Sequence, residues 1–396
     1  MTKQIWLDRV QKLLSKNIME GEGFRYTKPA SPPPPEYEEQ ALWDSCFHAI
    51  IWRWIDPQMA RDELLTVTAR QLAGGADAGM IPHFSYWKGS AQTLWNNPHT
   101  SRITQPPLIA VAAWRVYEIS KDKNLLELLY PRLIAFHDWF DRRRDPDKDH
   151  LVSLIHPWES GWDASPRWDR AMGLRRPTHE EAKQARFRLA QTVVQYDGDA
   201  LKLAQDGFFH VESIDFNAIR AADLEAVAQI AAALGKDAAS WKKRAADVQT
   251  AVRAKMIETG IHDLEGLDEK PIEVESASDY VALFGGCVSE SDAARLVQRL
   301  QEPRNWTQFP VCTNPTTLEA FDPGRYWRGN VWMSVNWLIY QGLRRYGYTR
   351  LASHLAERSL ALVEQTGFWE YYHPQTGTGL GSTPYSWSAL VVDMLE

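Results

Sequence analysis

The chain has 396 residues, a formal net charge of −7, and 44% hydrophobic and 24% charged residues. This composition is typical of a globular protein with a large core. The acidic balance, with no basic run longer than Arg142-Arg143-Arg144, argues against a nucleic-acid partner. No stretch reaches the length of apolar sequence that a membrane helix needs. Three widely spaced cysteines (Cys46, Cys287, Cys312) and an N-terminus without a signal-peptide pattern lead us to expect a cytoplasmic protein.

Apolar residues recur at spacings of three and four along most of the chain, which is the period of an amphipathic helix. In chain order, this pattern predicts helices over residues 4–19, 43–55, 57–73, 106–119, 122–144, 179–205, 219–234, 237–256, 276–284, 289–300, 330–346, 349–366 and 384–395. Short links such as Asp56-Pro57 and Gly347-Tyr348 are fit to join neighbouring helices into antiparallel hairpins. Strand signals are scarce and short.

Longer segments separate the hairpins, and these are rich in aromatic residues: 20–42, 74–105, 146–178, 206–218, 301–329 and 367–383. The alternation of short links and long loops predicts an all-α fold, a closed toroid of six helical hairpins with its functional loops on one rim. An open helical solenoid would show a repeat of fixed period, which we do not find. We interpret the run Pro32-Pro33-Pro34-Pro35 as a rigid extended segment and expect one domain over 1–396, with a loop insertion around 146–215.

The most informative segment is His156–Asp169, which holds three tryptophans, three carboxylates and an arginine among glycine and proline residues that disfavour a regular helix. Aromatic rings stack on sugar faces while carboxylates bind hydroxyls, so this mixture indicates a carbohydrate site. Asp163, set between tryptophans, is a candidate general acid, because partial burial keeps a carboxyl group protonated near neutral pH. Glu159 and Asp169 are compatible with the same role, and a loop aspartate also commonly caps a turn.

A second aromatic segment, Gly367-Phe368-Trp369-Glu370-Tyr371-Tyr372-His373-Pro374, presents another carboxylate. Hydrolysis of a glycosidic bond requires two carboxyl groups, one to protonate the leaving oxygen and one to act on water or on the sugar. Glu370 is therefore a candidate general base. The alternative is a loop carboxylate that only accepts a hydrogen bond from a neighbouring amide.

Asp44, in Trp43-Asp44-Ser45, lies where a predicted helix begins. A helix N-cap is the common role for aspartate at such a position. The functional alternative is a carboxylate that binds two sugar hydroxyls. His48, about one turn further along the same helix, is expected to be buried and hydrogen-bonded.

The segment Tyr326-Trp327-Arg328-Gly329-Asn330-Val331-Trp332 precedes another predicted helix. Trp327 and Trp332 can stack on a sugar ring, and Arg328 can orient a carboxylate. The alternative is packing at the start of a helix. Gln105, before Pro106-Pro107, carries no specific signal of its own.

The sequence contains none of the motifs that would indicate a different enzyme chemistry. A phosphate-binding glycine loop, a nucleophile elbow and a His-Glu-x-x-His zinc motif are all absent. Eleven histidines are scattered without ligand spacing, so we expect neither a metal nor a cofactor.

Taken together, these motifs resemble glycoside hydrolase family 63, in the short bacterial and archaeal branch that includes mannosylglycerate and glucosylglycerate hydrolases. The resemblance runs from Tyr37 to Trp387 in the family's order. The blocks that carry it are Trp43–Ala49, Pro157–Pro166, Tyr326–Trp332, and Gly367–Tyr372 with Gly377–Gly381.

The resemblance implies a six-hairpin toroid and an inverting mechanism on an α-glycoside. The family's acid falls on Asp163, in its Ser-Gly-x-Asp-x-Ser-Pro motif, and its base falls on Glu370. The two carboxyl groups of an inverting enzyme stand roughly 6.5–9.5 Å apart, which leaves room for a water molecule. By the same matching, the residues expected to line the pocket are Tyr37, Trp43, Asp44, Gln105, Trp158, Gly161, Trp327, Arg328 and Trp332.

The leaving-group side of the pocket departs from the family pattern. Relatives that use glycerate follow Arg-Pro-Thr with an acidic residue and then a tyrosine, where this chain has His179 and Ala182. Tyr385 occupies a place where those relatives use glutamine. Arg176 remains as a partner for an anionic leaving group.

We therefore expect an exo-acting, inverting α-glycosidase that cleaves a small α-glucoside or α-mannoside, with a 2-O-α-glycosylglycerate as the leading substrate. A disaccharide or another anionic aglycone is the alternative. Sugar 2-epimerases and ketose isomerases form a rival class on a similar helical toroid, with histidines as acid and base, so His83, His156 and His373 would then matter. The expected partner is a small carbohydrate, with no nucleic acid or membrane, and a homo-oligomer is compatible with the sequence.

Overall fold

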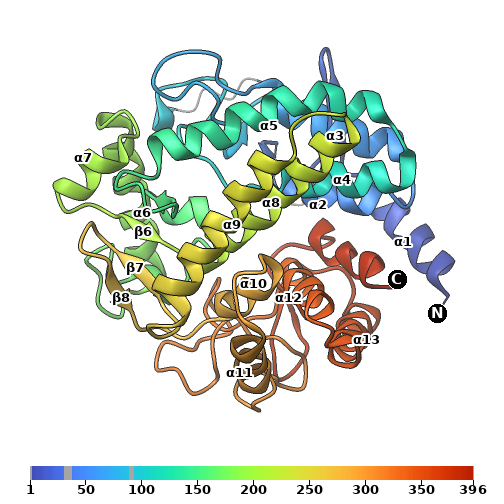
Figure 1. Cartoon of the computed structure of the whole chain (residues 1–396). Coiled ribbons are helices and arrows are strands. Elements are labelled where there is room, and N and C mark those ends of the chain that lie inside the picture. Colours follow the sequence, from blue (N-terminus) through green and yellow to red (C-terminus); the bar gives the residue numbers. More distant parts are fainter. Residues whose placement is uncertain (1, 31–37, 89–92, 396) are drawn as a thin grey trace.

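Six inner helical segments form a closed ring at the centre of the molecule (Figure 1). The computed structural model describes residues 2–30, 38–88 and 93–395. Each inner segment packs on the next, and the last packs on the first. In ring order they are α2 (Leu42–Trp52), α4 (Ile109–Ser120), α8 (Ile214–Ala233), α10 (Ser278–Phe284), α12 (Met333–Arg345) and the 3-10 helix η5 (Ser386–Met394).

Each inner segment pairs with an outer helix, which gives six hairpins and confirms the predicted (α/α) toroid. The outer helices are α1 (Lys3–Ser15), α3 (Pro57–Ala69), α5 (Lys123–Arg143), α9 (Ala239–Val252), α11 (Glu290–Leu300) and α13 (Thr349–Thr366). All residues of α2 and α10 are buried, whereas α11 buries a single stripe of apolar side chains. Helices that are apolar on every side belong inside and amphipathic helices belong outside, so the hydrophobic pattern sorts the two layers.

Several helices differ from their predicted bounds at their ends; α8, for example, begins at Ile214 inside the segment 206–218 that was predicted to be a loop. Two predicted helices differ more. The segment predicted as one helix over 179–205 is divided into α6 (His179–Gln195) and α7 (Ala200–Gln205). Asp197 and Gly198 between them have φ of +52° and +64°, and the Asp199 side chain caps the start of α7. The C-terminal segment predicted as a helix over 384–395 is the 3-10 helix η5.

Short strands occur within the long loops, as the sparse strand signals predicted. One four-stranded antiparallel sheet has the order β5-β6-β7-β8, and three two-stranded sheets pair β1 with β2, β3 with β4, and β9 with β10. Their bounds are β1 (Ile18–Gly21), β2 (Phe24–Thr27), β3 (Gln40–Ala41), β4 (Phe84–Ser85), β5 (Ser153–Leu154), β6 (Val211–Glu212), β7 (Asp263–Glu265), β8 (Lys270–Ile272), β9 (Tyr371–Tyr372) and β10 (Gly379–Leu380). Short non-α helices lie at η1 (Thr93–Trp95), η2 (Pro157–Ser160), η3 (Pro166–Trp168) and η4 (Arg253–Ile257).

A buried carboxylate closes the ring. Asp393, at the end of η5, is fully buried and pairs with Arg53, which follows α2, at 2.6 Å. It also accepts a hydrogen bond from Trp337 Nε1 of α12 at 2.8 Å. The last segment is thereby tied to both of its neighbours.

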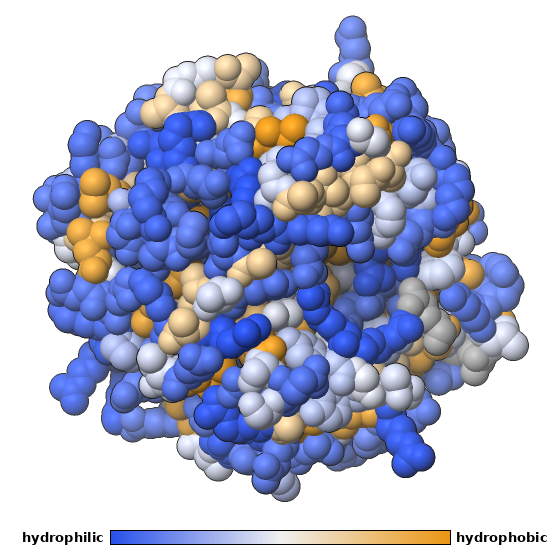
Figure 2. Space-filling view, in the orientation of Figure 1, coloured by the Kyte–Doolittle hydropathy of each residue, from blue (hydrophilic) through white to orange (hydrophobic). Residues whose placement is uncertain are grey.

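The surface is polar on the face drawn in Figure 2, where hydrophobic areas are small and separated by hydrophilic ones. Among the described residues, no helix is both long and apolar enough to cross a membrane.

Candidate active site

A cavity of about 300 Å³ brings together predicted site residues from segments that are far apart in the sequence. Among its lining residues are Trp43, Asp44, Gln105, Trp158, Gly161, Asp163 and Tyr385. This size lies at the lower end of the range for small-molecule pockets. Tyr37, also predicted to belong here, lies outside the described residues.

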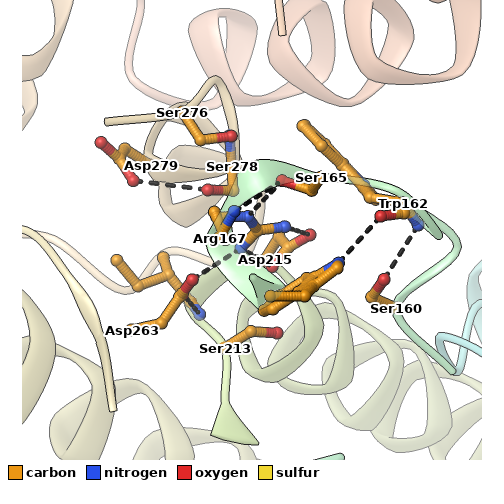
Figure 3. A network of polar contacts seen from close by, with 12 residues as sticks. Ser160, Trp162, Ser165, Arg167, Ser213, Asp215, Asp263, Ser276, Ser278 and Asp279 are labelled. Carbon is orange, nitrogen blue, oxygen red and sulfur yellow. Dashed lines mark hydrogen bonds and ion pairs between the residues drawn. The ribbon is translucent and has the colours of Figure 1, made fainter. Parts of the chain in front are cut away.

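The loop that carries Asp163 is held by a buried polar network (Figure 3). Ser160 Oγ accepts a hydrogen bond from the Trp162 amide at 2.9 Å, and Trp162 O accepts one from Trp168 Nε1 at 2.8 Å. Beyond the acid, Arg167 forms ion pairs with Asp215 at 3.1 Å and Asp263 at 2.9 Å. Hydrogen-bonded ion pairs of this kind are costly to break, so the network holds the Asp163 backbone in place on either side.

Gly161 serves this loop through its lack of a side chain. Its φ is +74°, and a Cβ at this position would lie 2.3 Å from the Trp43 indole. Glycine is therefore required both for the turn and for the close approach of Trp43, which itself lines the cavity.

The structure distinguishes among the three carboxylates that the sequence left as candidates for the general acid. Glu159 is fully buried and bonded to Arg144 at 2.9 and 2.7 Å, and it also accepts hydrogen bonds from the amides of Thr104 and Ile155. Asp169 is held by Arg328 at 3.0 and 2.6 Å. Asp163 is the one that lines the cavity.

Burial raises the pKa of Asp163 to about 7, an effect opposed by the charge of Arg186 and reinforced by the charge of Glu370. A carboxyl group with this pKa keeps its proton up to neutral pH. Asp163 can therefore donate a proton under conditions where an ordinary aspartate cannot.

Glu370 lies directly before β9, which pairs with β10, and it is 4% exposed. Its Oε2 accepts a hydrogen bond from the Ser382 amide at 2.9 Å, and its side chain also bonds with Tyr326, which lines the cavity. Burial raises the pKa of Glu370, whereas these hydrogen bonds lower it. The net effect is a raised pKa for Glu370, and the hydrogen bonds from Ser382 and Tyr326 are the contacts that favour its ionised form.

Four stacked aromatic rings run from the residue next to Asp163 to the residue next to Glu370. Trp162 stacks on Trp327 with ring centroids 5.1 Å apart. Trp327 stacks on Trp332 at 3.8 Å, and Trp332 stacks on Tyr371 at 4.9 Å. Both faces of the two inner indoles are covered, so Trp327 and Trp332 lie in a rigid wall behind the carboxylates rather than in the position expected for stacking on a sugar ring.

Asp44 is not a helix N-cap, because Ala41 has that position. Its Oδ1 accepts a hydrogen bond from Trp387 Nε1 at 2.9 Å, and burial raises its pKa to about 7.

Gln105 Oε1 accepts a hydrogen bond from the Trp43 amide at 3.3 Å and so satisfies a free donor at the start of α2. His48 is buried, as expected, with Nε2 at 2.6 Å from Ser386 Oγ.

Two arginines that the sequence placed in the pocket line a different cavity, together with Asp169 and Glu319. The side chain of Arg176 is 73% exposed and pairs with Glu319. Arg328 does orient a carboxylate, as predicted, but that carboxylate is Asp169. Neither arginine is among the residues that line the cavity around Asp163.

The sequence interpretation missed Arg186 on α6. This side chain is 6% exposed, and its Nε and Nη1 have no hydrogen-bond partner within the described part of the chain. It is the charged group with the largest effect on the pKa of Asp163. A signal was present, because Arg186 lies four residues from both Ala182 and Ala190 on the buried stripe of α6. An arginine at such a position requires an explanation.

The histidines do not support isomerase chemistry. His156 uses both ring nitrogens, accepting from the Trp158 amide at 3.1 Å and bonding to the carbonyl of Arg186 at 2.9 Å. His373 Nδ1 accepts from two loop amides. His83 does line the cavity, but burial lowers its pKa to about 3, far from the value that a neutral-pH acid or base needs.

Comparison with known proteins agrees with this geometry. The family model described as "Mannosylglycerate hydrolase MGH1-like glycoside hydrolase domain" matches residues 37–388. The chain is 33% identical to a mannosylglycerate hydrolase of Thermus thermophilus, with 89% of this chain and 93% of that protein covered. It is 29% identical to the glucosylglycerate hydrolase of Mycolicibacterium hassiacum, with 91% and 92% covered.

A solved structure gives the same result. A GH63 mannosylglycerate hydrolase from Thermus thermophilus, in complex with Tris, superposes with a TM-score of 0.90 at 30% identity, covering 98% of this chain and 99% of that chain. The chain is therefore a glycoside hydrolase and belongs to the MGH1-like branch of family 63.

Proposed function

We propose that this protein hydrolyses a 2-O-α-glycosylglycerate with inversion of the anomeric configuration. Asp163 donates its proton to the glycosidic oxygen as the bond to the anomeric carbon breaks. Glu370 takes a proton from the water molecule that attacks the opposite face of the sugar. The observation that carries this proposal is that Asp163 lines the cavity with a raised pKa, while Glu370, which is not itself a lining residue, bonds with Tyr326 of the cavity wall and acts through its charge on Asp163.

In this proposal, Asp44 is the carboxylate that binds hydroxyl groups of the sugar. It lines the cavity, and Trp387 fixes its side chain by donating to Oδ1, which leaves Oδ2 to accept from the substrate. The charges of Asp163 and Glu370 both raise the pKa of Asp44, so the three carboxylates interact electrostatically.

Arg186 is the residue we assign to an anionic leaving group, in place of Arg176. Six arginines of the described residues are buried, and five of them form ion pairs with aspartate or glutamate (Arg53, Arg144, Arg167, Arg220 and Arg328). Arg186 forms none among the described residues. A buried cation without an ion-pair partner is unfavourable. Arg186 therefore points to an anionic ligand that pairs with its guanidinium group.

The position of Arg186 also fits the leaving group. The acid marks the aglycone side of the cavity, because it protonates the oxygen that departs with the aglycone. Arg186 is not itself a lining residue, but its charge interacts with Asp163 and Tyr326, which line the cavity together with the neighbouring Phe187. A carboxylate on the aglycone would bind the guanidinium there through charge-assisted hydrogen bonds.

Proton NMR of the products tests the reaction. We expect the purified enzyme to release the β-anomer of the sugar first from glucosylglycerate or mannosylglycerate, and to leave neutral α-linked glucose disaccharides largely uncut. Early release of the α-anomer would contradict inversion. Cleavage of a disaccharide in preference to both glycerates would contradict the anionic leaving group.

Asp163→Asn tests the acid. The amide keeps the size of the side chain but cannot donate a proton, so we expect kcat to fall by about 10²–10⁴-fold with unchanged folding by circular dichroism. Arg186→Gln should instead raise KM for glycerate substrates. An Asp163→Asn enzyme with normal turnover would overturn the assignment of the acid.

A further inference from the structure

A histidine of the active-site cavity takes no part in the two proton transfers. His83 lines the cavity and directly precedes β4. Its amide donates to Ile103 O at 2.7 Å, and its carbonyl accepts from the Leu42 amide at 3.0 Å. These two partners lie two residues before Gln105 and Asp44, which line the same cavity. The backbone therefore holds His83 between the segments that carry these two residues.

The imidazole ring of His83 is also fixed in place. It stacks on the Phe84 ring with centroids 3.7 Å apart and planes inclined by 24°, and the residue is 5% exposed. A side chain that is already ordered loses little conformational freedom when it binds a ligand. The ring is therefore preorganised for contact with a substrate.

The hydrogen bonding of His83 differs from that of most other buried histidines. Five histidines are buried in the described part of the chain, and three of them (His48, His137 and His156) bond through Nε2. The rings of His83 and His210 have no hydrogen-bond partner within the described residues, and Nδ1 of each is buried. Of these two histidines, His83 is the one that lines the cavity. Because buried polar groups are normally bonded, its ring points to a partner supplied by the substrate.

The protonation state of the ring decides what it can bind. Burial and the charge of His156 lower the pKa of His83 to about 3, so the ring is neutral near neutral pH. A neutral imidazole has one N–H donor and one lone pair. Buried N–H groups without a partner are rarer than unpaired acceptors, so the lone pair belongs on the buried Nδ1 and the proton on Nε2. His83 therefore has an uncharged donor for a ligand.

This donor complements the carboxylate of Asp44. An ionised carboxylate only accepts hydrogen bonds, so a sugar hydroxyl that donates to one still has lone pairs that accept. A carboxylate and a neutral donor on adjoining segments thus suit a row of sugar hydroxyls. The aglycone side of the cavity is instead marked by the acid, Asp163, and by the charge of Arg186.

We propose that His83 is a specificity-determining residue, which donates a hydrogen bond from Nε2 to a hydroxyl group of the glycosyl unit. The assignment rests on the proposed function insofar as this cavity binds the sugar of a glycoside. It does not depend on which aglycone leaves.

Substitutions that replace one ring nitrogen at a time test the donor. The amide nitrogen of a glutamine can take the place of Nε2, whereas that of an asparagine reaches only as far as Nδ1. We expect His83→Gln to keep kcat/KM within about threefold of wild type, and His83→Asn and His83→Leu to lower it at least about fivefold. Circular dichroism and Tm show whether each variant is folded. A His83→Gln enzyme as slow as His83→Leu would overturn the Nε2 donor.

Deoxy sugars test the contact with a hydroxyl directly. The substrates are the glycoside that the wild type cleaves best and its 2-, 3-, 4- and 6-deoxy forms. On the form that lacks the hydroxyl bound by His83, wild type and His83→Leu should have kcat/KM values equal within about twofold. The parent glycoside and the other deoxy forms should keep the full loss. A purely structural role of His83 would lower kcat/KM by one factor on every substrate.

His210→Leu is the matched control, because His210 is the other buried histidine without a partner and does not line the cavity. Any loss that it causes should be the same on the parent glycoside and on all deoxy forms. A His83→Leu enzyme as active as wild type, or one with an equal loss on every substrate, would overturn the proposal. If the wild type cleaved another glycoside in preference to glycosylglycerates, only the proposed function would fail, because the comparison is made on whichever glycoside is cleaved best.

Discussion

At the residue scale, the partners of a carboxylate decide its role more than its neighbours in sequence do. Glu159, Asp163 and Asp169 share one aromatic segment, and their spacing could not rank them. Glu159 meets Arg144, and Asp169 meets Arg328 from 159 positions further along the chain. Such pairings depend on the fold, so the local sequence does not contain them. Resemblance to a family supplied the assignment to Asp163 that spacing could not.

The pKa of Asp163 predicts a specific pH profile. Because the acid must be protonated and its pKa is about 7, kcat/KM should fall as the pH rises through about 7. Glu370 must be ionised, and its raised pKa places the acidic limb above the ordinary glutamate value. A rate profile that stays flat to high pH would contradict a protonated Asp163. Asp44→Asn should move the alkaline limb to lower pH, because the charges of Asp44 and Asp163 repel each other and the amide removes one of them.

The same pKa affects stability in a defined direction. Between the unfolded pKa, about 3.9, and about 7, the folded protein holds a proton on Asp163 that the unfolded chain releases. The stability contributed by this protonation is complete below the unfolded pKa and is lost as the pH rises to about 7. The Tm of Asp163→Asn should therefore rise relative to wild type between about pH 4 and pH 7. A constant Tm difference would contradict the raised pKa.

At the element scale, the turn after β10 sets the position of the base. Gly381 has φ of +74°, and a Cβ there would lie 2.5 Å from Glu370 Oε2. Gly381→Ala should displace the carboxylate and lower kcat at least about tenfold, with a smaller change in KM. Gly347→Ala is the control, because Gly347 has φ of +77° and a Cβ there would meet no atom within 4 Å.

That pair of variants separates geometry from backbone strain. Both should lose about 1 kcal/mol of stability through their left-handed backbone, and Gly381→Ala should lose more because its Cβ would also crowd Glu370 and Tyr371. Gly381→Ala alone should lose activity. Equal kinetics in the two variants would show that contact with Glu370 does not matter.

The ends of helices were predictable where the helical spacing of apolar residues was the only signal. They were not predictable where a turn signal lay within that spacing. Helical spacing continued through 179–205, although Asp197-Gly198-Asp199 contains a turn signal and a helix cap. Aromatic composition likewise predicted a sugar site but not which rings face the sugar. Trp327 and Trp332 cover each other's faces, and only the folded chain reveals that.

At the scale of the whole molecule, the alternation of short links and long loops was enough to predict six hairpins. The sequence could not reveal how the ring closes, because closure joins residues near opposite ends of the chain. His48 with Ser386, Asp44 with Trp387, and Arg53 with Asp393 all link α2 to η5. One of these links holds a carboxylate of the cavity, so closure of the fold and assembly of the site occur together.

Removing Asp393 tests that closure. Asp393→Ala removes the 2.6 Å ion-pair partner of the buried Arg53, which keeps a longer pair with Glu118 at 3.7 Å, and it removes the acceptor for Trp337 Nε1. Breaking a buried pair on one side costs about 3–5 kcal/mol, so the free energy of unfolding measured in urea should fall by that amount. Glu364→Ala, on the exposed side of α13, should change it little. Because Asp393 does not line the cavity, activity per folded molecule should persist at low temperature. If Asp393→Ala were as stable as Glu364→Ala, the ring would be held closed by apolar packing of η5 alone.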